Sequence, residues 1–218
     1  NELKRMADMA QENLDRSIKG FLNQSDEYLN KIYHREEDIN NVSHAITDYL
    51  VKSNQLSLPL ADQKILGSMF YVVNDIERIG DHAENFADYT KTELKHNTGL
   101  TGDAKEEIKK MYEAVSKLLK LSLESFMAQD GVNTQEDKLA EIAALEASID
   151  KMERRYQKHH IKRLAKGDCE PRAGLLFSDM LSELERIADH SVNIAYSMSD
   201  EDEDEMLAAE NEALATNN

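Results

Sequence analysis

The sequence of 218 residues contains no tryptophan, two prolines, eight glycines and one cysteine, Cys169. So few helix-breaking residues leave long stretches rich in Ala, Leu, Glu and Lys, which favours an all-α fold. A single cysteine cannot form an internal disulfide, as is typical of proteins in a reducing compartment. No apolar run approaches the roughly 20 residues that a bilayer-spanning helix needs, and no signal-peptide pattern opens the sequence.

Basic residues are also scarce, because 26 Lys and Arg stand against 43 Asp and Glu, a formal net charge of -17. Nucleic acids and anionic lipid surfaces attract clustered Lys and Arg, so both are disfavoured as partners. The excess of carboxylates favours solubility, cationic partners or bound metal ions. Residues 200–205 are six consecutive acids, which repel one another and predict a flexible acidic tail.

Apolar residues recur at helical spacing in six segments. The second segment begins near Asp26, with Ser25 as its candidate N-cap. The fourth opens at Asp103, which with Glu106 has the pattern of a capping box. The sequence thus predicts two three-helix bundles, or one elongated six-helix body. The predicted division is a first repeat over residues 1–98, a second repeat over 99–199 and the acidic tail over 200–218.

One string of residues occurs twice in the chain. Residues 77–82, ERIGDH, recur as residues 185–190, ERIADH, 108 positions later. The similarity extends outward, since residues 74–76 correspond to residues 182–184, and Asn85 corresponds to Asn193. Self-similarity at a fixed offset indicates two copies of one structural unit.

Each copy keeps a Glu and an Asp four residues apart, as Glu77 with Asp81 and as Glu185 with Asp189. Residues at this spacing lie one above the other on a helix, with Cβ atoms ~5–6 Å apart. Like charges so placed cost roughly 0.2–0.5 kcal/mol of helix stability per pair. A small residue between them, Gly80 in the first copy, lets a neighbouring helix approach.

The middle helix of each copy supplies the neighbouring acidic residues. Glu146 and Asp150 form another four-spaced pair, and the equivalent positions in the first copy hold Glu36 and Asn40. The second bundle therefore brings together four carboxylates, whereas the first has three carboxylates and an amide. On this count we expect the second site to bind a divalent ion more tightly.

Clustered carboxylate oxygens suit hard cations, and the candidate ions are iron, manganese, magnesium, calcium or zinc. The alternative is a solvated acidic face on which Arg78 and Arg186 form ordinary salt bridges. Four further side chains are expected to support the ligands rather than bind the ion. These are Asn85 and Asn193, on the same polar stripes, and His82 and His190, which point ~100° away around their helices.

At these residues the chain resembles the PhoU family of phosphate-uptake regulators. The strings ERIGDHAEN and ERIADHSVN are specific, and the resemblance covers approximately residues 3–198. The family has two acidic four-spaced motifs per repeat, and three of the four match here. The fourth departs at Asn40, so the resemblance supports the first metal site less than the second. Residues 167–174 and the string that follows more closely resemble the PhoU-like domain that ends bacterial sodium/phosphate symporters. Because the sequence begins with Asn1 rather than Met, a fragment of a longer protein is compatible with it.

The resemblance implies two three-helix bundles that bind multinuclear metal clusters, iron among them, at these carboxylates. It implies a non-enzymatic regulator in the cytoplasm, at the inner face of the membrane. Its expected partners are a membrane phosphate transporter, in the same chain or as a separate subunit, and a sensor kinase, with a homodimer left open.

Two other classes of function compete with this interpretation. A carboxylate-bridged di-iron enzyme wants a Glu-x-x-His on each of two helices, but only Glu93 and His96 have that spacing. A purely helical interaction module, whose acidic stripes bind no metal, is the other alternative.

Overall fold

The computed structural model describes residues 2–96, 99–127 and 132–197, with only the backbone of 132–135. These residues form six α-helices and, within the described ranges, no strand. The helices are α1 (Glu2–Leu22), α2 (Leu29–Asn54), α3 (Leu60–His96), α4 (Gly102–Met127), α5 (Val132–Lys166) and α6 (Pro171–Tyr196). The predicted acidic tail, residues 200–218, lies outside the described part of the chain. In that described part, no helix combines the length and apolarity needed to cross a bilayer.

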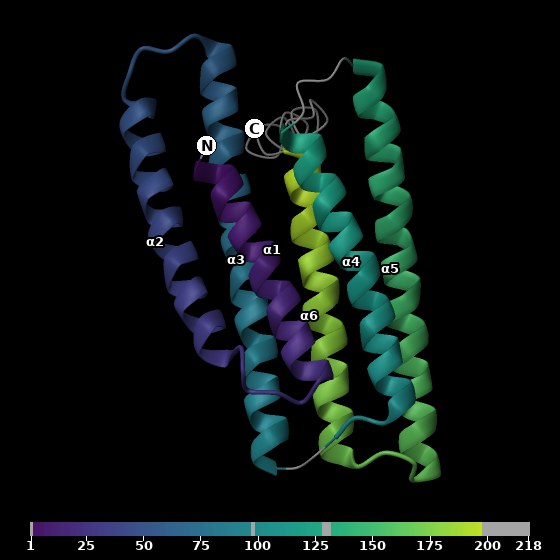
Figure 1. Cartoon of the computed structure of the whole chain (residues 1–218). Helices are drawn as coiled ribbons and strands as arrows, with labels where there is room; N and C mark the ends of the chain where they lie inside the picture. The colour runs from purple at the N-terminus through teal and green to yellow at the C-terminus, as the bar shows by residue number, and fades with distance from the viewer. Residues whose placement is uncertain (1, 97–98, 128–131, 198–218) are drawn as a thin grey trace, which may run out of the picture.

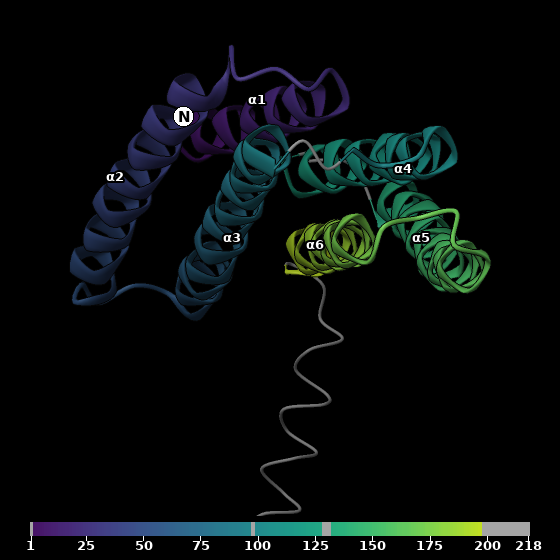
Figure 2. The ribbon, with the colours of Figure 1, turned by 90° about the horizontal axis from the view of Figure 1, so that it is seen from below.

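The six helices form two antiparallel three-helix bundles that lie side by side (Figure 1). Helices α1, α2 and α3 pack on one another, as do α4, α5 and α6, and the bundles meet through α3 with α6 and α1 with α4. Seen along the helices, α3 and α6 lie at the centre, α1 and α4 on one face, and α2 and α5 at the outer edges (Figure 2). This arrangement confirms the predicted all-α fold of two three-helix bundles. The domain boundaries at 98/99 and 199/200 stay predictions.

The close approach of α2 to α3 depends on a missing side chain. A Cβ atom added to Gly80 would lie 3.3 Å from Ile39 Cδ1, on the facing helix. Ile39 is fully buried there, and Ile149 of α5 is fully buried in the second bundle. The small residue between the two acids of the motif therefore lets α2 pack tightly, as its place in the sequence predicts, and brings Glu36 of α2 next to them.

Two predicted helix starts are wrong. Helix α2 begins three residues after Asp26, because Ser25 Oγ accepts a hydrogen bond from the Glu27 amide and closes only a local turn. Helix α4 begins before Asp103, because Thr101 Oγ1 accepts a hydrogen bond from the Ala104 amide at 3.3 Å and caps the helix. In both places several polar residues could serve as the helix N-cap, and the path of the backbone determines which of them does.

Candidate metal centres and the contact between the repeats

The first acidic cluster lies between α2 and α3 and is centred on a buried carboxylate. Glu36 is only 5% exposed. Asn40 Nδ2 donates a hydrogen bond to Glu36 Oε2 at 2.9 Å, whereas Glu36 Oε1 is enclosed without a partner. Since an unpaired buried polar atom costs free energy, this oxygen is the strongest sign of an unmet ligand in the cluster.

Electrostatics show which other acids belong to this cluster. Burial is the main cause that raises the pKa of Glu36 to about 7, and the charges of Glu84, Asp81 and Glu77 contribute to the same rise. Burial also raises the pKa of Glu77, with Asp81 adding to the effect. The sequence prediction missed Glu84, whose own pKa is raised by burial and by neighbouring acids. Four carboxylates therefore interact electrostatically here, and the amide of Asn40 binds one of them, Glu36.

The second cluster lies between α5 and α6 and contains the four predicted acids. Burial raises the pKa of Glu146, Glu185 and Asp189. The charge of Asp150 raises all three pKa values further. Asp150 itself lies 2.6 Å from Arg154 Nη2, a surface ion pair one helical turn away. The predicted residues thus meet electrostatically, although one of them is already paired with a cation.

Ordinary ion pairs partly satisfy both clusters. In the first, Arg78 lies 3.3 Å from Asp81 and 3.8 Å from Glu77. Across residues 2–96, 99–127 and 132–197, no three His, Cys, Asp or Glu side chains converge closely enough to hold one metal ion. The oxygen-only donor sets and the unpartnered Glu36 Oε1 suit a hard cation. Side chains would have to turn away from Arg78 or Arg154 to bind it.

The predicted supporting histidines lie at the contact between the repeats. His82 Nδ1 of α3 is 2.5 Å from Glu183 Oε2 of α6, and His190 Nδ1 of α6 is 2.8 Å from Asp75 Oδ1 of α3. These are the same contact made twice, because each residue has its counterpart 108 positions away. The two imidazole rings lie between the contacts, with centroids 5.5 Å apart.

Glu183 is the better satisfied of the two acids at this contact. It also accepts hydrogen bonds from Asn85 Nδ2 at 3.1 Å and from the Tyr89 hydroxyl at 3.3 Å. Burial opposes its ionisation, yet the hydrogen bonds from His82 and Asn85 outweigh burial and hold its pKa below its usual range. Asn193, the counterpart of Asn85, is exposed. A supporting role toward bound metal stays a prediction for all four side chains.

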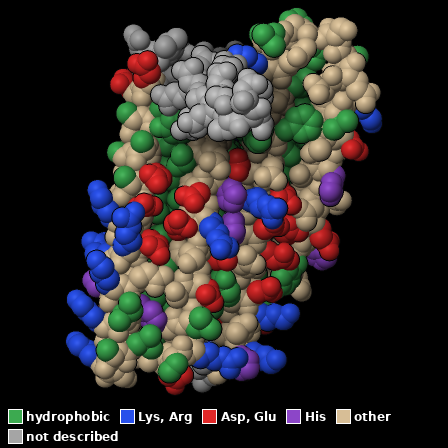
Figure 3. Space-filling view, turned by 180° about the vertical axis from the view of Figure 1, so that it is seen from behind, with side chains coloured by type: hydrophobic (Ala, Val, Ile, Leu, Met, Phe, Trp, Pro, Cys, Tyr) green, Lys and Arg blue, Asp and Glu red, His purple; other side chains and the backbone are tan. Residues whose placement is uncertain are grey.

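These features share one face of the molecule, opposite α1 and α4. Figure 3 shows histidine side chains at the middle of that face and acidic side chains on either side of them. The two clusters come from the outer helix pairs, α2 with α3 and α5 with α6, while the histidine contact comes from the central pair. The internal repeat therefore places two acidic clusters symmetrically about one central strip.

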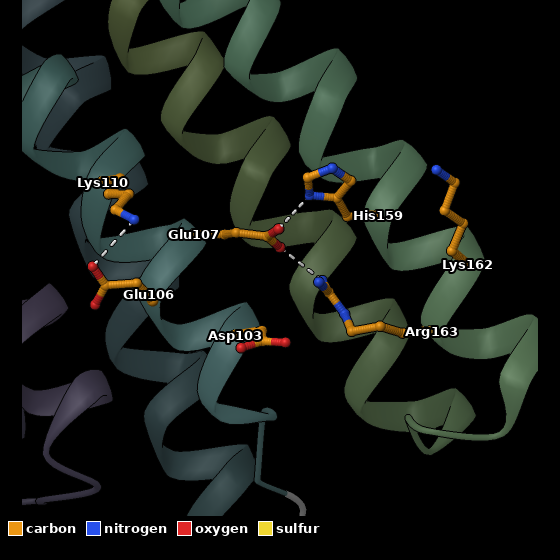
Figure 4. Close-up of a pocket in the computed structure, with 7 residues that line it drawn as sticks. All are labelled: Asp103, Glu106, Glu107, Lys110, His159, Lys162 and Arg163. Carbon is orange, nitrogen blue, oxygen red and sulfur yellow. Dashed lines mark hydrogen bonds and ion pairs between the residues drawn. The ribbon is translucent and has the colours of Figure 1, made fainter.

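A surface pocket of about 360 Å³ lies elsewhere, between α4 and α5 (Figure 4). Glu107 points across it, with Oε1 2.6 Å from His159 Nδ1 and Oε2 2.8 Å from Arg163 Nη2. No predicted site residue lines this pocket. Its charges are largely paired with one another, so it is not part of either candidate centre.

Two repeated three-helix bundles, each with an acidic cluster against its third helix, define a class of all-α repeat protein. Within that class, the PhoU domain model matches residues 3–90 and again 108–198. The chain therefore belongs to the PhoU family.

Individual relatives agree with this assignment. The chain is 23% identical to a phosphate-specific transport system accessory protein PhoU homolog of Clostridium acetobutylicum, over 90% of this chain and 87% of that protein. Its fold is similar to PhoU from Pseudomonas aeruginosa, with a TM-score of 0.79, 21% identity and coverage of 90% and 91% of the two chains. It is also similar to the phosphate transport system regulatory protein PhoU from Streptococcus pneumoniae, with a TM-score of 0.77, 21% identity and coverage of 92% and 93%.

Proposed function

We propose that this protein is a non-enzymatic regulator of phosphate transport that acts by contact with a membrane transporter. The observation that carries the proposal is the family membership, which covers both bundles. The accessory and regulatory roles printed for the relatives in Clostridium acetobutylicum and Streptococcus pneumoniae point in the same direction. The transporter is either a separate subunit or, as the symporter-like stretch at residues 167–174 suggests, part of the same chain.

The two acidic clusters are the proposed cation sites of this regulator. Each would hold its ion through carboxylates of two neighbouring helices. In the first cluster these are Glu36, Glu77, Asp81 and Glu84, and in the second Glu146, Asp150, Glu185 and Asp189. A bound cation would neutralise acids whose pKa values burial and mutual repulsion already raise. Binding would also tie α2 to α3 and α5 to α6, because each cluster spans two helices.

The rival di-iron enzyme has little support in the geometry. Glu93 is 1% exposed and accepts a hydrogen bond from Gln24 Nε2 at 3.1 Å. His96 is exposed at the last residue of α3. The two residues with the required spacing therefore do not form a repeated metal site.

Phosphate uptake in cells tests the proposed function. Cells whose protein carries Glu185→Ala with Asp189→Ala should accumulate labelled phosphate abnormally, because the second cluster is lost. Both side chains lie outside the buried apolar stripe of α6, so circular dichroism should show an intact fold. Purified protein should show neither phosphatase nor oxidase activity above a metal-only control.

A matched control removes two acids from elsewhere. Glu113 and Glu124 lie exposed on α4, each beside a lysine one helical turn away. The double variant Glu113→Ala with Glu124→Ala removes the same charge and should leave uptake normal. Normal uptake with a folded Glu185→Ala, Asp189→Ala variant would mean that the second cluster does not carry the regulation.

A further inference from the structure

The contact between α3 and α6 contains two imidazoles that are each bound at one nitrogen only. Nδ1 of His82 faces Glu183, and Nδ1 of His190 faces Asp75. Within the described residues, neither Nε2 atom has a hydrogen-bond partner, and neither is among the enclosed unpartnered atoms. Neither Nε2 atom is therefore fully enclosed, and the side chains of His82 and His190 keep 11% and 23% of their surface exposed.

The carboxylates decide which nitrogen of each ring is available. A carboxylate accepts hydrogen bonds, so it holds the ring proton on Nδ1 and leaves the lone pair on Nε2. A carboxylate that binds the far nitrogen of a histidine orients the ring and raises its basicity as a metal ligand. The structure makes this arrangement twice, once from each repeat.

The spacing of the rings fits a shared ion. Two imidazoles bound through one nitrogen each to a tetrahedral ion, with bonds of about 2.1 Å, have ring centres roughly 5 Å apart. The ring centroids of His82 and His190 are 5.5 Å apart, and the rings are tilted by 31°. The spacing of the two ring centroids is therefore compatible with both rings binding one ion.

Imidazole nitrogen favours zinc and its neighbours among the transition metals over magnesium or calcium. We propose that His82 Nε2 and His190 Nε2 together bind one Zn²⁺ ion between the two repeats, with water completing the coordination. This site differs from the acidic clusters in its ligand atoms and in its helix pair, α3 with α6. It does not depend on cation binding by those clusters.

Such an ion would join the bundles at their central contact. Because one ligand comes from each repeat, binding requires α3 and α6 to keep their present register. Zn²⁺ should therefore stabilise the folded chain against unfolding, since a ligand that binds only the native state raises its stability.

Long-range proton–nitrogen NMR of the histidine rings, on the unaltered protein at pH 7.5 with excess Mg²⁺, tests the site directly. Excess Mg²⁺ occupies oxygen sites and leaves imidazole free. One equivalent of Zn²⁺ should shift the Nε2 signals of two histidines together. Unchanged Nε2 signals would overturn the proposal without requiring any variant to fold.

Variants then assign the two rings. His82→Gln and His190→Gln should each weaken Zn²⁺ binding at least tenfold in calorimetric titration. Asp75→Asn and Glu183→Gln should weaken it by about 10- to 100-fold, because each loses the group that orients a ligand. The control His34→Gln alters an exposed histidine of α2 and should bind Zn²⁺ as the unaltered protein does. Unchanged affinity in a folded His82→Gln or His190→Gln variant would also overturn the proposal.

Discussion

The two acidic clusters arise from one repeated pattern, yet the repulsion between their carboxylates is offset by different partners. In the first, Glu36 is buried and takes a hydrogen bond from the amide of Asn40. In the second, Glu146 is only partly buried, and Asp150 is directed to Arg154 at the surface. A buried carboxylate needs a hydrogen-bond donor. Asn40 is therefore the residue that permits the burial of Glu36, rather than simply a lost ligand.

At the contact between the repeats, by contrast, the acid of the second repeat has more hydrogen-bond donors than the acid of the first. Glu183, in the second repeat, accepts hydrogen bonds from three residues of α3. Asp75, in the first repeat, faces His190 with a side chain one methylene shorter. A repeat thus keeps the spacing of its chemical groups while single substitutions redistribute burial and pairing between its copies.

Removing the two acids of this contact should have the largest and most unequal effect. Glu183→Ala leaves His82, Asn85 and Tyr89 without their acceptor and should lower the free energy of unfolding by about 3 kcal/mol. Asp75→Ala affects His190 alone and should cost about 1 kcal/mol. Urea unfolding at pH 7 measures both, and equal losses would contradict the asymmetry.

The pH dependence of stability should separate the two clusters next. The pKa of Glu36 rises from 4.5 to about 7 on folding. Between these values the folded chain binds more protons than the unfolded chain, so stability falls as pH rises from about 5 to about 7.5. Glu36→Gln should remove this slope and stabilise the metal-free protein at pH 8 by up to about 3 kcal/mol.

The matched variant in the second cluster is Glu146→Gln. Glu146 is less buried than Glu36, so its effect on the slope should be smaller. Urea unfolding from pH 5 to pH 8 with a chelator present measures both variants. An unchanged slope in Glu36→Gln would assign the pH dependence to other acids.

The fold and seven of the eight acids of the two clusters could be predicted from the sequence, because both depend on local spacing. Helical periodicity predicts the six helices, and the offset of 108 predicts that each motif pair faces a middle helix. Helix starts were not accessible where several caps compete, as at Ser25 and Thr101. Their outcome depends on tertiary packing and on the path of the chain.

Two features of the site escaped the sequence prediction for different reasons. Glu84 has no acidic counterpart, since Val192 occupies the equivalent position in the second repeat. A comparison of the two repeats therefore does not identify Glu84 as part of a shared motif. Glu183 and Asp75 were visible as matching acids, but their histidine partners lie about 100 positions away. Only the antiparallel packing of α3 on α6 reveals that the histidine of each repeat binds the acid of the other repeat.

Asn40 of the first cluster and Asp150 of the second occupy equivalent positions, and exchanging their side-chain types tests how each cluster offsets its charge. Asn40→Asp removes the donor to Glu36 and adds a charge, so it should destabilise the metal-free protein by about 1–2 kcal/mol. Asp150→Asn relieves repulsion and should stabilise it by about 0.5 kcal/mol. With Mn²⁺ present both signs should reverse, because binding to the native state adds stability that increases with the logarithm of the affinity.

Thermal melts with and without Mn²⁺ measure these effects. Lys110→Gln, which alters an exposed ion pair on α4, is the control and should respond to neither condition. If Asn40→Asp and Asp150→Asn gave the same Mn²⁺ response as the unaltered protein, the acidic faces would be solvated surfaces without a cation site.

The smallest expected effect tests whether Glu84 makes the first cluster a set of four. Glu84→Gln keeps the shape of the side chain and removes one of the charges that raise the pKa of Glu36. That pKa should fall, and the metal-free protein should gain about 0.5 kcal/mol at pH 8. Carbon NMR titration of the Glu36 carboxyl measures the shift directly. Asp88→Asn, one turn further along α3, is the control and should change it less. An unmoved pKa in Glu84→Gln would leave three carboxylates in the first cluster, and the second would again be expected to bind a divalent ion more tightly.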